Sequence, residues 1–212
     1  MGGSLPPRGV TSRGEVQPLP APVPSVLFQV RDRPPRTLLF DLETLRSAAD
    51  VGGWGNAHRM GVAIGVACFL EEGRFEVYGE KEIRGLAEAL RSATLVVGFN
   101  INRFDYKVLA GYTGEDYSRT LPTLDLLDSI FFRLGFRIGM GHLAQETLGL
   151  GKSADGLQSL QWVKDGRLDL VESYCRKDVE ILRDLYLHGR REGCIFYRDR
   201  QRDLRLKLCV DW

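Results

Sequence analysis

Proline is concentrated at one end of this chain, and this sets where a folded domain can begin. Eight of the nine prolines lie between Pro6 and Pro35. Because proline lacks a backbone N–H and fixes φ, neither a helix nor a central strand can run from Pro18 to Pro24. We therefore predict a proline-rich, weakly ordered lead over residues 1–35 and a single folded domain over residues 36–212. The lead is interpreted either as a linker or as a vector-derived tail.

The composition is that of an ordinary globular protein, with 43% hydrophobic and 27% charged residues. Lys and Arg total 29 against 28 acidic residues, so nucleic-acid binding would have to come from a local site rather than from overall charge. No apolar run approaches the roughly 18 residues of a membrane span. Four scattered cysteines form no C-x-x-C pair, which argues against a zinc site and indicates reduced thiols in a cytoplasmic protein: Cys68, Cys175, Cys194 and Cys209.

Hydrophobic periodicity after residue 36 predicts an α/β domain, in which strands come first and helices then cover a mixed sheet. Strands are expected at 37–43, 58–70, 74–78 and 94–99, and helices at 81–92, 104–111, 123–135, 141–149, 157–165 and 168–190. Two alternating segments, Cys194–Tyr197 and Leu204–Val210, flank a charged turn and are compatible with a C-terminal β-hairpin.

Two acids follow the first apolar strand at a spacing of two. Because alternate residues of a strand point to the same face, Asp41 and Glu43 should project together. Paired carboxylates at a sheet interior repel one another and are costly to desolvate, and a divalent cation relieves both penalties. Mg²⁺ prefers such hard oxygen ligands. The alternative is a strand end whose acids face solvent, and the D-x-E pattern alone does not exclude it.

A third acid, Asp105, lies where an apolar strand over 94–99 runs through a polar turn into a helix. In isolation it is explained by a helix N-terminus, where an acid stabilises by about 0.3–1 kcal/mol. A fourth acid, Asp178, shares a helix face with Tyr174 and with an apolar stripe, so it should lean toward the core. An unpartnered buried acid is expensive, and a metal would supply the partner. The alternative partners are the nearby cations Arg176, Lys177 and Arg183.

These segments run in the order strand with D-x-E, strand–turn–helix with N-x-x-x-F-D, and helix with Y-x-x-x-D. The set covers about residues 37 to 190 and resembles the DEDD exonuclease superfamily of RNase H-like nucleases, in its tyrosine-bearing branch. It is most similar to the proofreading domains of family B DNA polymerases and to their bacterial stand-alone or helicase-associated relatives. The histidine-bearing branch would need His at the position of Ser173. The resemblance implies an RNase H-like mixed β-sheet flanked by α-helices.

The same resemblance implies a 3′–5′ exonuclease that hydrolyses phosphodiester bonds of DNA or RNA with two divalent cations, Mg²⁺ or Mn²⁺. Asp41 would bridge the two cations. Glu43 and Asp178 would bind the cation nearer the attacking water, and Asp105 would act mainly on the other. Tyr174 would orient the water through its hydroxyl, with simple packing on an apolar helix face as the alternative role.

Four further residues are candidates for substrate binding. Asn100 and Phe104 match the second motif, and Thr44 directly follows the first. The chain then departs from the family pattern, because a longer, glycine-rich loop runs over 45–56. Trp54 in this loop would stack on a base or cap the core. Asn100 would contact the terminal nucleotide or hold the turn, and Phe104 is expected to serve the core more than the base.

The expected partner is the single-stranded 3′ end of a nucleic acid, with a helicase or a polymerase as an associated protein and no membrane. Residues 183–207 are locally basic and would guide a phosphate backbone or form a solvated, charged hairpin. His142 is expected in a loop or at a helix start rather than as a ligand. Alternative functions are a non-catalytic nucleic-acid or partner-binding module and an endonuclease on the same fold.

Overall fold

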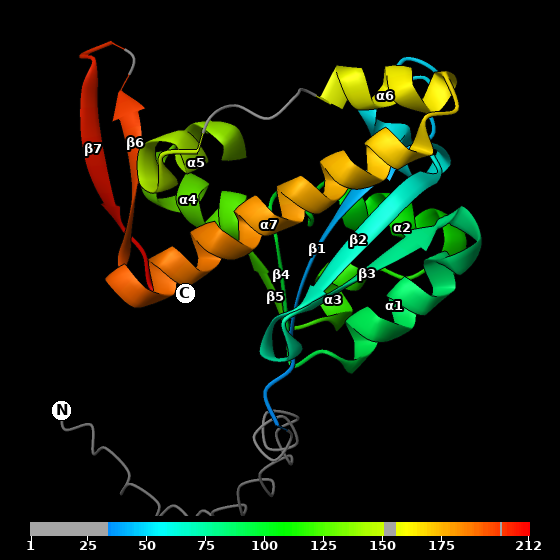
Figure 1. Cartoon of the computed structure of the whole chain (residues 1–212), viewed down its shortest axis with the longest axis horizontal. Helices are drawn as coiled ribbons and strands as arrows, with labels where there is room; N and C mark the ends of the chain where they lie inside the picture. The colour runs from blue at the N-terminus through cyan, green and yellow to red at the C-terminus, as the bar shows by residue number, and fades with distance from the viewer. Residues whose placement is uncertain (1–33, 151–155, 200) are drawn as a thin grey trace, which may run out of the picture. The chain divides into compact units, whose positions relative to one another are not determined.

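The computed structural model describes residues 34–150, 156–199 and 201–212. The predicted proline-rich lead lies almost entirely outside these ranges, so the domain boundary stays a prediction. Within the described residues, a five-stranded sheet carries helices on both faces and is followed by a separate two-stranded hairpin (Figure 1). The predicted α/β class and the C-terminal β-hairpin are therefore confirmed.

The sheet has the strand order β3-β2-β1-β4-β5, which places β1 at its centre. β2 runs antiparallel to both β1 and β3, whereas β1, β4 and β5 are parallel to one another. The hairpin pairs β6 and β7 in antiparallel register. The strands are β1 (Thr37–Thr44), β2 (Val62–Phe69), β3 (Arg74–Gly79), β4 (Leu95–Gly98), β5 (Thr123–Asp125), β6 (Cys194–Asp199) and β7 (Leu204–Cys209).

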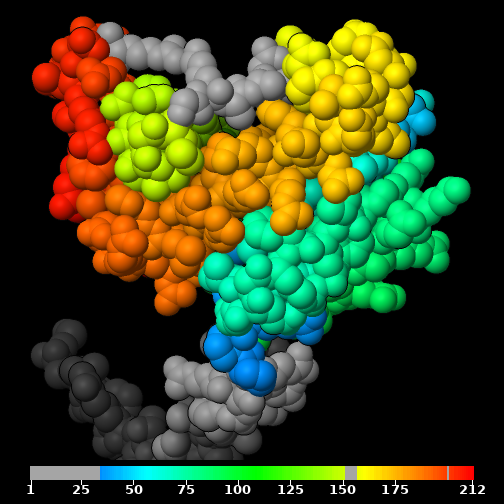
Figure 2. Space-filling view, in the orientation of Figure 1, coloured from blue at the N-terminus to red at the C-terminus, as the bar shows by residue number. Residues whose placement is uncertain are grey.

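Seven α-helices and three short 3-10 helices connect these strands within the described residues. The longest helix, α7, crosses one face of the sheet, with α6 beside its beginning and the hairpin beside its end (Figures 1 and 2). The α-helices are α1 (Ile83–Ser92), α2 (Asp105–Thr113), α3 (Tyr117–Thr120), α4 (Leu126–Leu134), α5 (Met140–Leu148), α6 (Gly156–Lys164) and α7 (Leu168–Glu192). The 3-10 helices are η2 (Trp54–Arg59), η3 (Leu70–Glu72) and η4 (Glu80–Glu82).

Strand β1 separates two hydrophobic cores, because its side chains alternate between the faces of the sheet. Leu38 and Phe40 point into a core that includes buried residues of α1, α2 and α3. Leu39 points into the opposite core, built with α4, α5 and α7. Asp41 and Glu43 continue the Leu39 side of the strand, so the acids project toward α7.

Two predicted elements differ from the structure. The strand predicted from His58 begins at Val62, because Trp54–Arg59 form η2 and Gly61 turns the chain with a φ of 70°. Thr123–Asp125, predicted as the start of a helix, is strand β5 and pairs with β4. Contacts with distant segments decide both, because η2 packs on α2 and Thr123–Asp125 pairs with β4. Helix α3 was not predicted.

The C-terminal segment is joined to α5 and α7. The hydroxyl of Thr147 accepts a hydrogen bond from the backbone N–H of Phe196 at 2.9 Å, which ties α5 to β6. Gly189 of α7 leaves the space in which the indole of Trp212 packs. All four cysteines are free thiols, of which only Cys209 is exposed. In the part of the chain that the structure describes, no helix is long and apolar enough to cross a membrane.

Gly111 on α2 allows η2 to approach, and we expect its replacement to be costly. A Cβ at Gly111 would overlap the backbone carbonyl oxygen of His58, which cannot yield as a flexible side chain does. Gly111→Ala should therefore lower the free energy of unfolding by about 1–3 kcal/mol in chemical denaturation. The matched control is Gly85→Ala on α1, where a Cβ meets only Tyr78 at 3.6 Å. This control should be neutral or stabilising by up to about 1 kcal/mol, and equal effects of the two substitutions would contradict the account.

Candidate active site

Strand β1 delivers two carboxylates to the α7 side of the sheet. Its register with β2 is regular from Leu38 to Glu43 and shifts between Glu43 and Thr44. The regular part keeps Asp41 and Glu43 on one face, as the alternation predicts. Both side chains are only partly buried, so they border on solvent rather than lying within the core.

Helix α7 brings the third carboxylate across the sheet. Val171, Cys175 and Val179 lie on its buried face, and Asp178 lies on the same face with 8% exposure. The inward position predicted for Asp178 is thus confirmed. The neighbouring cations that offered an alternative explanation pair elsewhere: Arg176 and Lys177 with Glu180, and Arg183 with Asp184.

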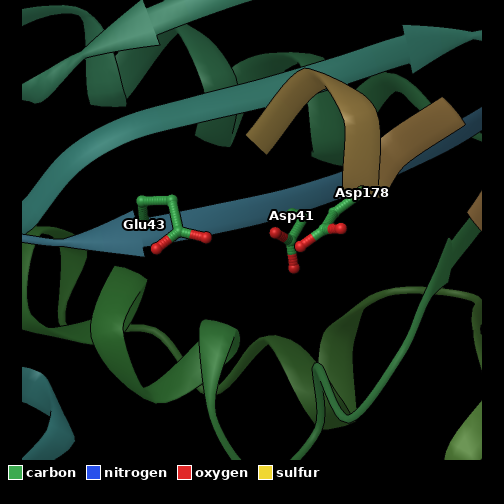
Figure 3. A group of neighbouring side chains, drawn as sticks. All are labelled: Asp41, Glu43 and Asp178. Carbon is green, nitrogen blue, oxygen red and sulfur yellow. The ribbon is translucent and has the colours of Figure 1, made fainter. Parts of the chain in front are cut away.

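The carboxylates of Asp41, Glu43 and Asp178 converge on one space. One oxygen from each lies within 4.8 Å of the others. Figure 3 shows Asp41 facing Asp178 from the strand, with Glu43 further along β1 and turned toward the same space. Oxygen-only donors at this separation are the set that Mg²⁺ and Mn²⁺ accept. The motifs of two separate segments, β1 and α7, thus contain side chains that the fold brings together.

Asp105 lies deeper than the other three acids. It is the first residue of α2 and only 2% exposed, and its Oδ1 atom has no hydrogen-bond partner in the structure. Its negative charge raises the pKa of Asp41, which places it beside the group. It does not belong to the set of described acids with ligand oxygens within 4.8 Å. A buried acceptor without a partner costs about 1–3 kcal/mol, and a cation would remove that cost.

Asp125 is a site residue that sequence reasoning missed. It ends β5 and caps α4, and it is 4% exposed. Its carboxylate accepts hydrogen bonds from the backbone N–H groups of Asn100 at 2.8 Å, Asn102 at 3.0 Å and Leu127 at 3.0 Å. Asp125 therefore fixes the turn that leads into Asp105. An acid directly before an apolar helix is an N-cap signal, and it was the available clue.

The pKa values of the clustered acids are raised, first by burial and then by their mutual repulsion. Burial raises the pKa of Glu43 to about 7, with a further contribution from Asp178. Burial likewise raises the pKa of Asp105 to about 8, and the charges of Asp125 and Glu43 add to it. The pKa of Asp41 is raised by burial and then by Asp105, Glu43 and Asp178, in that order. Asp41 is thus the centre of the cluster, since all three other acids act on it.

Two hydroxyl groups border the carboxylates. The half-buried Tyr174 lies one helical turn before Asp178, and burial and the nearby charges of Asp178 and Glu43 raise its pKa. Ser159 on α6 is fully buried beside Glu43, where its hydroxyl partly offsets the rise in the pKa of Glu43. The Ser159 hydroxyl nonetheless falls short of hydrogen-bond geometry. Sequence reasoning missed Ser159, because nothing in α6 signals that it faces β1.

An open cavity of about 740 Å³ adjoins the acids and is lined by Asp41, Glu43, Asp105 and Asp178. The four predicted substrate residues line the same cavity: Thr44, Asn100, Phe104 and Trp54. The rings of Trp54 and Phe104 meet edge to face with centroids 5.8 Å apart. Trp54 is 71% exposed, so its indole is available to a ligand.

Three of these residues also have structural roles. Asn100 has a left-handed backbone with a φ of 71°, a conformation that Asn tolerates better than most residues. The hydroxyl of Thr44 donates to the carbonyl of Arg46 at 3.0 Å, which bends the chain away from the strand. Phe104 packs against the core while lining the cavity. Contact of any of the four with a nucleotide stays a prediction.

No protein-family model and no curated protein matches this sequence. Among solved structures, the chain is similar to the family B DNA polymerase from the hyperthermophilic archaeon Pyrobaculum calidifontis, with a TM-score of 0.56, 19% identity, and coverage of 76% of this chain and 24% of the polymerase. It is also similar to Trypanosoma brucei RNase D, with a TM-score of 0.52, 15% identity, and coverage of 76% of this chain and 59% of RNase D. The chain thus spans less than two thirds of each neighbour, and at these identities the likeness concerns the fold. The predicted RNase H-like fold, shared with a family B DNA polymerase, is confirmed.

The raised pKa values predict how stability depends on pH. The folded chain favours the protonated forms of Glu43 and Asp105. Their contribution to the free energy of unfolding is full below the ordinary pKa values of 4.5 and 3.8. It is lost as the pH rises through the raised pKa values of about 7 for Glu43 and about 8 for Asp105. In chelator, the melting temperature should fall over this window, and Mn²⁺ should restore it most at the alkaline end. Asp105→Asn should make the melting temperature depend less on pH, and Mn²⁺ should raise the melting temperature less in this variant. A pH profile identical in the variant and the unmodified chain would contradict this reading.

Proposed function

We propose that this chain is a metal-dependent 3′–5′ exonuclease that hydrolyses single-stranded DNA or RNA. The observation that carries the proposal is the convergence of Asp41, Glu43 and Asp178, with ligand oxygens within 4.8 Å of one another at an open cavity. The fold shared with a polymerase and with RNase D supports a nuclease. The 3′ polarity comes from the motif resemblance and is part of the proposal.

The residues present fit divalent cations. The donors are carboxylate oxygens. The pKa values of Asp41, Glu43 and Asp105 are raised, and Oδ1 of the buried Asp105 lacks a hydrogen-bond partner. These are the conditions under which bound cations lower the energy of a site. Two bound Mg²⁺ or Mn²⁺ ions would supply an activated water and charge stabilisation for the leaving oxygen. We assign the binding of these ions to Asp41, Glu43, Asp105 and Asp178.

We assign the roles within the cluster from how the carboxylates act on one another. Asp41 feels the charge of each of the other acids, so it is the residue to serve both ions. Glu43 and Asp178 act on each other and form one side of the site. Asp105 approaches from α2 on the sheet's other flank, and we assign it to the second ion. Asp125 fixes this approach through the backbone of the Asn100 turn.

We assign Tyr174 to holding the attacking water. Its hydroxyl lies among the charges of Asp178, Glu43 and Asp41, interacts with Asp178, and stays protonated because its pKa is raised. The cavity lined by the carboxylates would receive the terminal nucleotide, with Asn100 and Thr44 as polar neighbours. The exposed indole of Trp54 offers a face on which the terminal base stacks, a contact that contributes about 1–3 kcal/mol in single-strand binding.

The test uses 5′-labelled single-stranded DNA and a matching RNA, each with Mg²⁺ or Mn²⁺. We expect a ladder that shortens from the 3′ end and disappears in chelator. Asp41→Ala should reduce the rate by about 100-fold or more, the scale for losing a preorganised charged group. Glu88→Ala is the matched control, since Glu88 is an exposed acid on α1 against the other core. The sugar that is degraded faster identifies the substrate class.

Three outcomes would contradict this function. A 3′-blocked or circular substrate that is cut as fast as a free end would indicate an endonuclease. Tight binding without cleavage in either metal would indicate a non-catalytic module. Cleavage that persists in Asp41→Ala would place the chemistry elsewhere.

Removing the hydroxyl of Tyr174 separates water positioning from packing. Tyr174→Phe retains the ring contact with Trp162, whose centroid lies 6.2 Å away. We expect kcat to fall by about 10–100-fold, the scale of an outer hydrogen-bonding group at a metal site. KM and the melting temperature should stay unchanged. An unchanged kcat would assign Tyr174 to packing alone.

A further inference from the structure

A second groove lies at the C-terminal hairpin, outside the carboxylate cavity. It has a volume of about 470 Å³ and is lined by residues of the α4–α5 connection, of α5 and of β6, including Phe136, Arg137, His142 and Tyr197. Arg137 links it to the active site, because its Nη2 donates to the Oδ1 of Asn100 at 2.6 Å. Since Asn100 lines the first cavity, the two recesses share a border at this hydrogen bond.

The groove presents aromatic rings at an accessible surface. Phe136 and Tyr197 meet edge to face with centroids 6.1 Å apart. Phe136 lies on the short connection between α4 and α5, and its side chain is 48% exposed. An exposed ring braced by a second ring provides a flat face of the kind on which unpaired bases stack.

The groove lining holds two cations, Arg137 and Arg198, and one acid, Asp199. Arg137 is exposed and has no carboxylate partner within 4.0 Å among the described residues. Arg198 is held by Glu146 and Asp203. The lining acid Asp199 is engaged in the hairpin turn, where its Oδ1 accepts the backbone N–H groups of Gln201 and Arg202 at 2.9 and 3.3 Å. Arg137 is therefore the cation that remains to meet a phosphate.

The walls of the groove are fixed to each other before any ligand arrives. Nε2 of His142 on α5 accepts the backbone N–H of Arg198 at 2.9 Å. The hydroxyl of Thr147 both accepts from the N–H and donates to the carbonyl of Phe196. Figure 2 shows the hairpin packed directly against α5. A preformed groove orders few groups on binding and so loses little entropy.

We propose that this groove, which we call the hairpin groove, binds the single strand on the 5′ side of the scissile phosphate. Phe136, braced by Tyr197, stacks a base, and Arg137 meets a backbone phosphate at the border with the active site. This inference rests on the proposed function, because the strand direction follows from a 3′ end in the carboxylate cavity. It accounts for the hairpin, which lies beyond the segment that carries the active-site motifs.

The test compares strand lengths in the Asp41→Ala protein, in which turnover does not interfere. Fluorescent trinucleotides and strands of about 15 nucleotides, as DNA and as RNA, bracket the site sizes of single-strand binders. Phe136→Ala should weaken binding of the long strand by about five-fold or more, as expected from one lost stacked base. Arg137→Gln should reduce the slope of log affinity against log salt by about 0.7 for the long strand. Phe136→Ala should leave trinucleotide binding unchanged.

The matched controls are Phe132→Ala and Arg84→Gln. Phe132 is 89% exposed and outside the groove lining, and Arg84 lies on α1 against the other core. Both should leave the long strand unaffected. In the active chain, Phe136→Ala should raise KM for long strands only and leave kcat unchanged.

The proposal is overturned if the groove variants affect both lengths equally or neither length. It is also overturned if the controls weaken binding as much as the groove variants. The binding comparison does not depend on turnover. If the chain cleaved nothing, the exonuclease function would be contradicted, and the comparison of strand lengths would still test the hairpin groove.

Discussion

Repulsion among the four carboxylates that line one cavity raises the energy of this site. The charges of Asp105, Glu43 and Asp178 all raise the pKa of Asp41, and three cations of α7, Arg176, Lys177 and Arg183, pair with Glu180 and Asp184. The surrounding apolar packing holds the acids in place against this repulsion. Binding of cations at this open cavity would remove the free-energy cost of the repulsion.

The two faces of the sheet have different roles: one packs in a hydrophobic core and the other carries the acids. Leu38 and Phe40 anchor β1 in the core that is built with α1, α2 and α3. The same alternation sends Asp41 and Glu43 to the face that α7 crosses. Two features of the preceding turn position Asp105. Asn100 has a left-handed backbone, and the carboxylate of Asp125 accepts its backbone N–H. The rigid elements thus position the acids, while Trp54 of η2 lines the cavity and the hairpin contributes to a separate groove.

The sequence predicted those parts of the site that local periodicity encodes. A period of two placed Asp41 beside Glu43, and a helical stripe placed Asp178 inward, since both depend only on side chains within one element. The parts that depend on contacts between distant segments could not be predicted. Ser159 faces Glu43 only because α6 packs on β1, and β5 forms only because β4 lies beside it. His58 begins no strand, because Gly111 on another helix admits η2 at that position. The hairpin groove likewise arises where the α4–α5 connection meets β6, far apart in sequence.

The central claim is that this carboxylate cluster binds divalent cations, and calorimetric titration of the chain with Mn²⁺ tests it most directly. With Glu43 and Asp105 titrating at about 7 and about 8, binding near neutral pH must displace protons. Titrations in buffers of different ionisation enthalpy measure that release. The account predicts two ions per chain, proton release that diminishes above pH 8, and loss of both in Asp41→Ala. Absence of binding, or binding that Asp41→Ala leaves intact, would contradict it.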